Sequence, residues 1–196
     1  MVIRLKELVT PLGEETAESL LLGEEVYLSG KIYIMRDATL RRIFEEGATL
    51  PVTLKDQVIF FGAPSFVKEN DEYRILSVGV TTSQRMEKYI PRLLRELGVR
   101  AIIGKGELSE KMNQEFSGSR SVYLLFVGGA AALATSSIQR VNKVWWEDLK
   151  GEALFEVEMK SLGPAFVAID VNGNNLLLNN RNKVLENLRS IMKEEE

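Results

Sequence analysis

The stretch Val26-Tyr-Leu-Ser-Gly-Lys-Ile-Tyr-Ile-Met-Arg-Asp37 decides the fold class of this chain. From Val26 to Met35, apolar residues alternate with polar or amphipathic ones, the pattern of a β-strand with one buried face. Asp37 then takes the position of a helix N-cap, and the apolar residues after it have helical spacing as far as Gly47. A strand that leads directly into a helix is typical of α/β domains.

The same alternation of strand-like and helix-like segments continues towards the C-terminal end. Further strands are predicted at residues 58–62, 73–80, 99–103, 122–127, 140–145, 153–159 and 166–170, and helices at 86–97, 128–137 and 184–192. Residues 69–72 form a turn, so the strand 73–80 pairs with 58–62 or with 65–68. The predicted fold class is therefore α/β, a layered domain with a mixed sheet rather than a doubly wound nucleotide fold.

Two of these segments have features that bear on packing. The runs 99–103 and 122–127 are predominantly apolar and are bounded by glycines, which predicts strands buried on both faces. Pro91 falls inside the apolar stripe 86–97, so it either kinks that helix or marks its true beginning.

Composition bounds the class of protein. The chain has 196 residues, 45% of them hydrophobic and 27% charged, with a net charge of −3. This profile predicts one globular domain over residues 1–196, with a frayed, solvated acidic tail at 193–196. The net charge predicts no nucleic-acid partner, and no apolar run is long enough to predict a membrane partner. Because the first residues lack a signal-peptide pattern, we expect the chain in the cytoplasm.

Two residue types are absent, and their absence narrows the chemistry. Without cysteine, the chain forms no disulfide and cannot itself ligate an iron–sulfur cluster or a thiolate-bound zinc. Without histidine, it cannot assemble a Ser-His-Asp triad, a Cys-His pair or a histidine-based metal site. We therefore expect no metal site in this chain, and any proton transfer must use other side chains or a partner.

Three candidate sites each follow a predicted strand, and the first is centred on Arg36. Arg36 lies at a strand end beside the beginning of the helix that follows. An arginine fork next to free helix N–H groups suits a carboxylate ligand. The alternative interpretation is an arginine that simply pairs with a nearby acid of the chain.

The second candidate is the segment Gly79–Met86, where the hydroxyl residues Thr81, Thr82 and Ser83 precede Arg85. One helix N-cap explains one of these hydroxyls and leaves two without a structural role. An arginine in the first turn of a helix is slightly unfavourable for the helix dipole unless an anion is bound there.

The third candidate is Lys105, which is flanked by Gly104 and Gly106 after the strand 99–103. The glycine spacing does not match a phosphate-binding loop, and Gly128-Gly129 does not match a dinucleotide site. If the three strands are neighbours, the cations converge at one sheet edge and suit a substrate with two carboxylates, because two arginine forks discriminate planar carboxylates.

Sequence elements around these candidates match a known family. They run in family order over residues 5–180: the strand Val26–Tyr33, Arg36-Asp37, the strand Val58–Gly62 with Pro64, Thr81-Thr82-Ser83-x-Arg85-Met86, Gly104-Lys105-Gly106, Gly128-Gly129-Ala130-Ala131, Val144-Trp145-x-x-Asp148-Leu149, and Gly163-Pro164-Ala165-Phe166 with Asp170 and Asn172-Gly173-Asn174. In these elements the chain resembles the C-terminal domain of class I fumarases, which also occurs as a separate β subunit and is similar to L(+)-tartrate dehydratase β subunits.

The resemblance implies a swivelling β/β/α domain and a partner, the α subunit, that carries a 4Fe–4S cluster as Lewis acid for the substrate hydroxyl. Arg36, Thr82, Arg85 and Lys105 would bind the dicarboxylate substrate, and Thr81, Arg85 and Lys105 would form the catalytic set. Thr81 would lie near the carbon that loses a proton, although an unperturbed threonine hydroxyl is too weak an acid to become the base. A homo-oligomer or an α2β2 assembly is expected.

The chain also departs from the family pattern. Leu40 stands where the family usually has histidine, and Glu107 stands where it often has a second glycine. The leading hypothesis is a β subunit for the hydration of fumarate to malate, with tartrate dehydration as the alternative. Two other hypotheses remain: a non-catalytic binding or scaffold homologue, and a stand-alone sugar- or nucleotide-binding domain.

Overall fold

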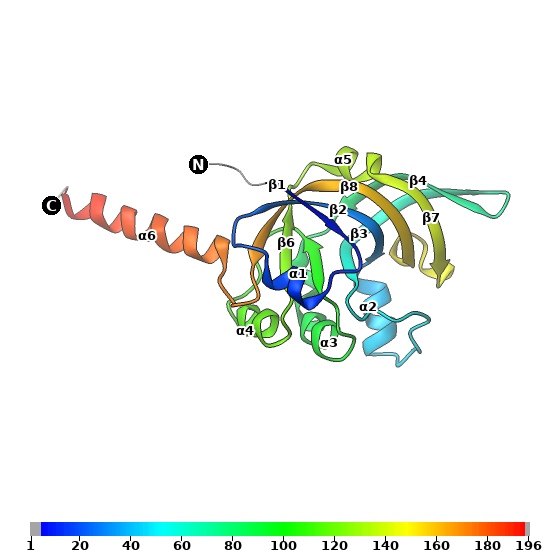
Figure 1. The fold of residues 1–196 in the computed structure, drawn as a ribbon, viewed down its shortest axis with the longest axis horizontal. Helices are drawn as coiled ribbons and strands as arrows, with labels where there is room; N and C mark the ends of the chain where they lie inside the picture. Colours follow the sequence, from blue (N-terminus) through cyan, green and yellow to red (C-terminus); the bar gives the residue numbers. More distant parts are fainter. Residues whose placement is uncertain (1–4, 195–196) are drawn as a thin grey trace.

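A computed structural model describes residues 5–194 and shows a mixed sheet with helices against it (Figure 1). The strands are β1 (Leu5–Val9), β2 (Glu25–Met35), β3 (Val58–Glu69), β4 (Glu72–Val80), β5 (Ala101–Gly104), β6 (Val122–Phe126), β7 (Ile138–Trp145) and β8 (Leu154–Ile169). The α-helices are α1 (Glu14–Glu18), α2 (Asp37–Phe44), α3 (Ile90–Arg95), α4 (Lys111–Gly118), α5 (Ala131–Ser136) and α6 (Leu176–Glu194), and the 3₁₀ helices are η1 (Ser83–Tyr89) and η2 (Glu147–Glu152).

The sheet closes on itself through its last long strand. Its strand order is β1-β2-β3-β5-β6-β8-β7, and β4 pairs with β3 outside this path. Strands β2, β3, β5 and β6 are parallel, whereas β8 runs antiparallel to both β6 and β2. The β2–β8 pairing therefore joins β2, β3, β5, β6 and β8 in a ring.

Strand side chains alternate between two hydrophobic cores. Ile34, Phe60 and Leu124 belong to a core between the two halves of the curved sheet, with α1 and α5. Their neighbours Met35 and Tyr123 belong to a second core, which the parallel strands share with α2, η1, α3 and α4. Two sheet layers and one helical layer result, so the predicted layered α/β fold is confirmed (Figure 1). The swivelling motion stays a prediction.

Most predicted elements are present, with differences in their bounds. Residues 58–62 and 65–68 lie in one strand, β3, and β4 pairs with it from Gly62 to Glu69. The stripe 86–97 forms η1 and then α3, with Pro91 in the first turn of α3, where its missing N–H costs nothing. Arg36, not Asp37, is the residue before α2, so the N-cap prediction was wrong by one position. The strands predicted at 153–159 and 166–170 are one strand, β8, because β2 pairs with it from Phe155 to Phe166, across the gap between the two predictions.

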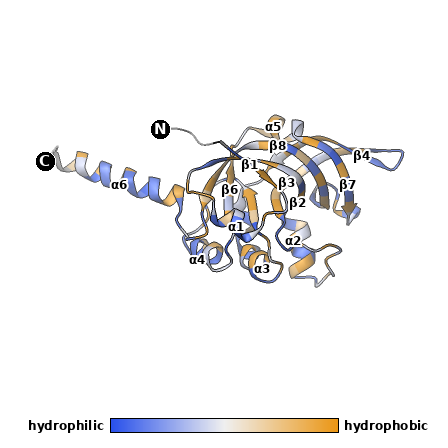
Figure 2. Cartoon of the chain, in the orientation of Figure 1, coloured by the Kyte–Doolittle hydropathy of each residue, from blue (hydrophilic) through white to orange (hydrophobic). Residues whose placement is uncertain are grey.

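The final helix α6 projects away from the rest of the fold (Figure 1). Val184, Leu185, Leu188 and Ile191 are exposed along it, and Figure 2 shows apolar and polar residues alternating there. The helix includes the backbone of residues 193 and 194, and the rest of the predicted acidic tail lies outside the described residues. Among the described helices, none combines the length and the apolar character that a membrane span requires.

Candidate functional site

Strand register brings the three predicted candidate segments to one edge of the sheet. Met35 pairs with Phe61, and β3 pairs in turn with β5, so β2 and β5 end at the same edge. The amide N–H of Thr81 donates to the carbonyl oxygen of Phe61 at 2.7 Å, which places the segment after β4 on that row. Thr82 and Lys105 form a parallel bridge. The predicted convergence therefore follows from the backbone alone.

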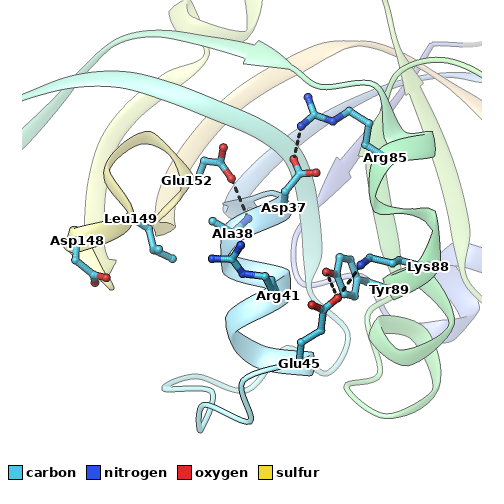
Figure 3. A pocket seen from close by; sticks show the side chains of 10 residues that line it. All are labelled: Asp37, Ala38, Arg41, Glu45, Arg85, Lys88, Tyr89, Asp148, Leu149 and Glu152. Atoms are coloured by element: carbon cyan, nitrogen blue, oxygen red, sulfur yellow. Dashed lines mark hydrogen bonds and ion pairs between the residues drawn. The ribbon is translucent and has the colours of Figure 1, made fainter.

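Asp37 contacts both arginines of the predicted set, and Figure 3 shows its contact with Arg85. Its Oδ2 atom accepts a hydrogen bond from Arg36 Nε at 3.0 Å and lies 3.4 Å from a terminal nitrogen of Arg85. Asp37 is the first residue of α2, and Arg85 lies in the first part of η1, so one carboxylate holds these two elements together. Its position in the sequence, directly after Arg36, was the only signal for this role.

Glu152 closes the N-terminus of α2. Its Oε2 atom accepts a hydrogen bond from the amide of Ala38 at 2.8 Å, and its Oε1 atom lies 3.5 Å from Arg36 Nε. Its carbonyl oxygen accepts a hydrogen bond from the hydroxyl of Thr39 at 2.5 Å. The helix N–H that was predicted to bind a ligand carboxylate therefore binds a carboxylate of the chain itself. Arg36 also pairs with acidic residues of the chain, which was the alternative interpretation of this arginine. No local pattern indicated Glu152, because it lies 114 residues from Ala38.

Lys105 differs from both arginines. It is half-buried at the end of β5, and its side chain makes no ion pair or hydrogen bond with residues 6–192. Its carbonyl oxygen accepts a hydrogen bond from the amide of Ser83 at 3.0 Å. The backbone is thus fixed while the ammonium group keeps its donors for another partner.

A cleft of about 640 Å³ opens between α2, η1 and η2 beside these residues (Figure 3). Its lining residues are Asp37, Ala38, Arg41, Glu45, Arg85, Lys88, Tyr89, Asp148, Leu149 and Glu152. Of the predicted site residues only Arg85 lines it, and Thr82 lines a second hollow of about 420 Å³ with Glu107 and Arg181. The structure thus brings the backbone of the predicted residues to one edge, where Arg85 lines one opening, Thr82 lines the other, and Arg36, Thr81 and Lys105 line neither of these two.

A carboxylate in the cleft gives a pH-dependent contribution to stability. Hydrogen bonds from Lys88 and Tyr89, at 2.7 and 2.6 Å, lower the pKa of the Glu45 carboxyl below its usual 4.5. A lowered folded-state pKa adds stability above the unfolded pKa, and this is lost as the pH falls through the folded pKa. We expect the Tm difference between wild type and Glu45→Gln to shrink in thermal melts below about pH 4. A difference that stays constant down to pH 2 would contradict this assignment.

The chain is similar in sequence to known proteins of one family. The profile of the family described as Fumarase C-terminus matches residues 2–179. The L(+)-tartrate dehydratase subunit beta of Escherichia coli (strain K12) is 31% identical over 190 residues, which is 96% of this chain and 94% of that protein. The "Putative L(+)-tartrate dehydratase subunit beta" of Methanocaldococcus jannaschii is 34% identical, covering 92% of this chain and 95% of that protein. The "Putative fumarate hydratase class I" of Geobacillus stearothermophilus is 34% identical, covering 88% of this chain and 34% of that protein.

Proposed function

Because this chain belongs to the Fumarase C-terminus family, we propose that it is the β subunit of a hydro-lyase that acts on a four-carbon dicarboxylate. The observation that carries the proposal is the meeting of Arg36, Arg85 and Lys105 at one sheet edge, next to Thr81 and Thr82. Three cations against the two carboxylates of Asp37 and Glu152 leave this edge with a net positive charge, which favours an anionic ligand over a neutral one.

The ion pairs of the two arginines leave donors for such a substrate. A guanidinium group has five N–H donors, and both acidic contacts of Arg36 are made through Nε. A terminal nitrogen of Arg85 forms an ion pair with Asp37 Oδ2 at 3.4 Å but no hydrogen bond, and the Arg85 side chain is 56% exposed. Asp37 and Glu152 therefore orient the forks, whose remaining N–H groups bind the substrate carboxylates in our proposal.

The remaining residues have complementary roles in this proposal. Lys105, which faces Thr82 across their backbone bridge, binds a substrate carboxylate as a point charge. Thr81 and Thr82 supply hydroxyls beside the substrate, with Thr81 near the carbon that loses its proton. We assign Thr81 a positioning role, since its hydroxyl is too weak an acid to serve as the base.

The iron–sulfur cluster belongs on the partner in this proposal. The full sequence has no cysteine and no histidine, and residues 5–194 hold no group of metal-ligating side chains. The chain therefore does not fit a 4Fe–4S cluster, whose ligands are thiolates. We place the cluster on an α subunit, for which the name "subunit beta" of the Escherichia coli relative is the support.

Two dicarboxylates are the candidate substrates of the proposed enzyme. Hydration of fumarate to malate is the first candidate, and the Geobacillus stearothermophilus relative supports it. Dehydration of L(+)-tartrate is the second, favoured by the names of the relatives that match nearly the whole chain. Leu40, which stands where the family usually has histidine, is fully buried in the helical core.

The test is reconstitution of the two-subunit enzyme. The chain is produced anaerobically with its candidate α subunit, the cluster is reconstituted, and fumarate, malate and L(+)-tartrate are assayed with and without this chain. Turnover that requires both chains supports the proposal, and the preferred substrate decides between the two candidates. A fully loaded complex that converts none of the three would contradict it and favour the non-catalytic homologue.

Lys105 gives a quantitative check of carboxylate binding. We expect Lys105→Met to raise the KM by about 10- to 100-fold, because a hydrogen bond to a charged group contributes about 1.5–3 kcal/mol. The loss of an unpaired surface charge should leave the Tm within about 2 °C of wild type. Steady-state kinetics with the matched control Lys160→Met, an exposed lysine on β8, measure the effect. Equal KM values for the two variants would remove Lys105 from the site.

A further inference from the structure

Two loops carry the proposed substrate contacts, and the backbone ties them together at one point. The first loop holds Thr81, Thr82 and Ser83, and the second holds Lys105 and Gly106. They meet at the Thr82–Lys105 bridge, which includes the hydrogen bond from the Ser83 amide to the Lys105 carbonyl oxygen. A single backbone bridge beyond the ends of the strands is a weak restraint on loops that must hold a substrate.

Beneath this junction lies the hydroxyl of Tyr123, which comes from β6. The Tyr123 oxygen is 3.0 Å from Ser83 Oγ and 3.0 Å from the Gly106 carbonyl oxygen. Tyr123 is 1% exposed and Ser83 is 0% exposed, so their hydrogen bond is shielded from water, whereas Gly106 lies at the exposed end of the junction. One side chain from the sheet therefore contacts both loops.

The protons at this junction follow from hydrogen-bond chemistry. Tyr123 has a single hydroxyl proton, and the carbonyl oxygen of Gly106 can only accept. Both hydroxyls are satisfied when Tyr123 donates to Gly106 and Ser83 donates to the Tyr123 oxygen. Burial raises the pKa of the Tyr123 phenol, so it keeps its proton at neutral pH. Removal of this oxygen would leave the buried Ser83 hydroxyl without this partner and would free the Gly106 carbonyl oxygen from the sheet.

The surroundings hold the Tyr123 ring in place. A Cβ atom on Gly104 would lie 3.1 Å from ring atom Cε2 of Tyr123 and would overlap the Ser83 hydroxyl. Glycine at this position is thus what lets Ser83 approach the strand. On its other side the ring packs against Phe116 of α4, with centroids 6.1 Å apart. A buried ring packed on two sides has little freedom to follow a moving loop.

We propose that Tyr123 is a positioning residue that sets the distance between the Thr81–Thr82 hydroxyls and the Lys105 ammonium group. The proposal rests on the proposed hydro-lyase function, and it assigns Tyr123 no contact with the substrate. Its effect on catalysis passes through Ser83 on one loop and Gly106 on the other. Small displacements of substrate-positioning groups can lower rates about 100-fold. The loss of the Tyr123 hydrogen bonds should therefore act mainly on kcat/KM.

The test compares Tyr123→Phe with Tyr33→Phe in the two-subunit enzyme. Tyr33 is also buried, 2% exposed, and its hydroxyl donates to Glu156 at 2.8 Å, away from both loops. We expect Tyr123→Phe to lower kcat/KM by about 10- to 100-fold and Tyr33→Phe to change it less than about threefold, with similar shifts in Tm. Equal kinetic losses in the two variants would overturn the positioning role.

A second measurement does not depend on activity. Hydrogen exchange of the Ser83 amide reports directly on its bond to Lys105 in the full chain. We expect faster exchange at Ser83 in Tyr123→Phe and unchanged exchange in Tyr33→Phe. If the wild-type complex turns over no substrate, the proposed function fails, while exchange still tells whether Tyr123 holds the loops. An unchanged exchange rate of the Ser83 amide in Tyr123→Phe would refute the proposal that Tyr123 holds the two loops together.

Ser83→Ala completes a double-mutant cycle. If Tyr123 acts through Ser83, the effects on kcat/KM of Tyr123→Phe and Ser83→Ala should be strongly non-additive, with the double variant within about threefold of the worse single variant. Additive effects would mean that the two hydroxyls act independently, which contradicts the proposal.

Discussion

Arg85→Ala is expected to lower kcat/KM for the dicarboxylate substrate by about 100-fold or more. The change removes a planar fork that Asp37 holds at 3.4 Å beside Arg36. A bidentate, charge-assisted contact contributes about 3 kcal/mol, which corresponds to roughly two orders of magnitude in rate or affinity. Since Arg85 is 56% exposed, the free energy of unfolding should change by less than about 0.5 kcal/mol. Initial rates of the two-subunit enzyme and a thermal melt measure the two quantities.

Two companion variants separate charge from geometry. Arg85→Lys keeps the positive charge and loses the fork, so we expect an intermediate loss of about tenfold. Arg74→Ala removes an arginine of similar exposure on β4, whose ion pair with Glu69 is 3.9 Å long, and should keep full activity. Equal activity of Arg85→Ala and Arg74→Ala would show that Arg85 binds no substrate carboxylate.

Gly104→Ala is expected to give the largest loss of stability of any single methyl addition in the site. The new Cβ would overlap the Ser83 hydroxyl and press on Ser83 Cβ and the Tyr123 ring, each at 3.1 Å. Overpacking of a filled core costs up to about 3 kcal/mol, which for a chain of this length lowers the Tm by roughly 6–12 °C. Chemical denaturation and calorimetry measure the change.

A matched control and a suppressor test the cause. Gly118→Ala, at the end of α4, has nothing within 4 Å of the added Cβ and should leave the Tm unchanged or slightly raised. Ser83→Ala removes the overlapping hydroxyl, so the Gly104→Ala/Ser83→Ala variant should be more stable than Gly104→Ala alone. A double variant that is less stable than both single ones would contradict a clash at Ser83.

The main features of the fold were predictable because the periodicity of its buried strands is strong. The apolar runs before Gly104 and Gly128 gave β5 and β6, and the hairpin β3–β4 followed from its turn. The helix α4 was missed because only Met112 and Phe116 are buried in it, which is too few for a helical pattern. The strand β8 was divided in two because Gly163-Pro164 is typical of the end of a strand. The sequence does not show that β2 pairs with β8 on both sides of this dipeptide, or that β6 pairs with the residues after it.

The candidate site was predictable where function follows a strand end. Arg36, Arg85 and Lys105 were predicted because each stands after a strand, and the register of the sheet brings those strand ends together, while their role in substrate binding stays a prediction. Glu152 was not predictable, because it acts on α2 from 114 residues away. The same holds for Tyr123, which in the sequence is one aromatic residue of an apolar strand and whose hydroxyl matters only through its distance to Ser83.

The ring of strands also bears on how the chain is made. Strand β8 is the last of the sheet to leave the ribosome, and it must pair with β2, formed by residues more than 120 positions earlier. Contacts so distant in sequence slow folding, and an unclosed sheet exposes strand edges meanwhile. Until residue 169 has emerged from the ribosome, β2 and β6 lack their shared neighbour, so the ring of strands can close only after β8 has been made.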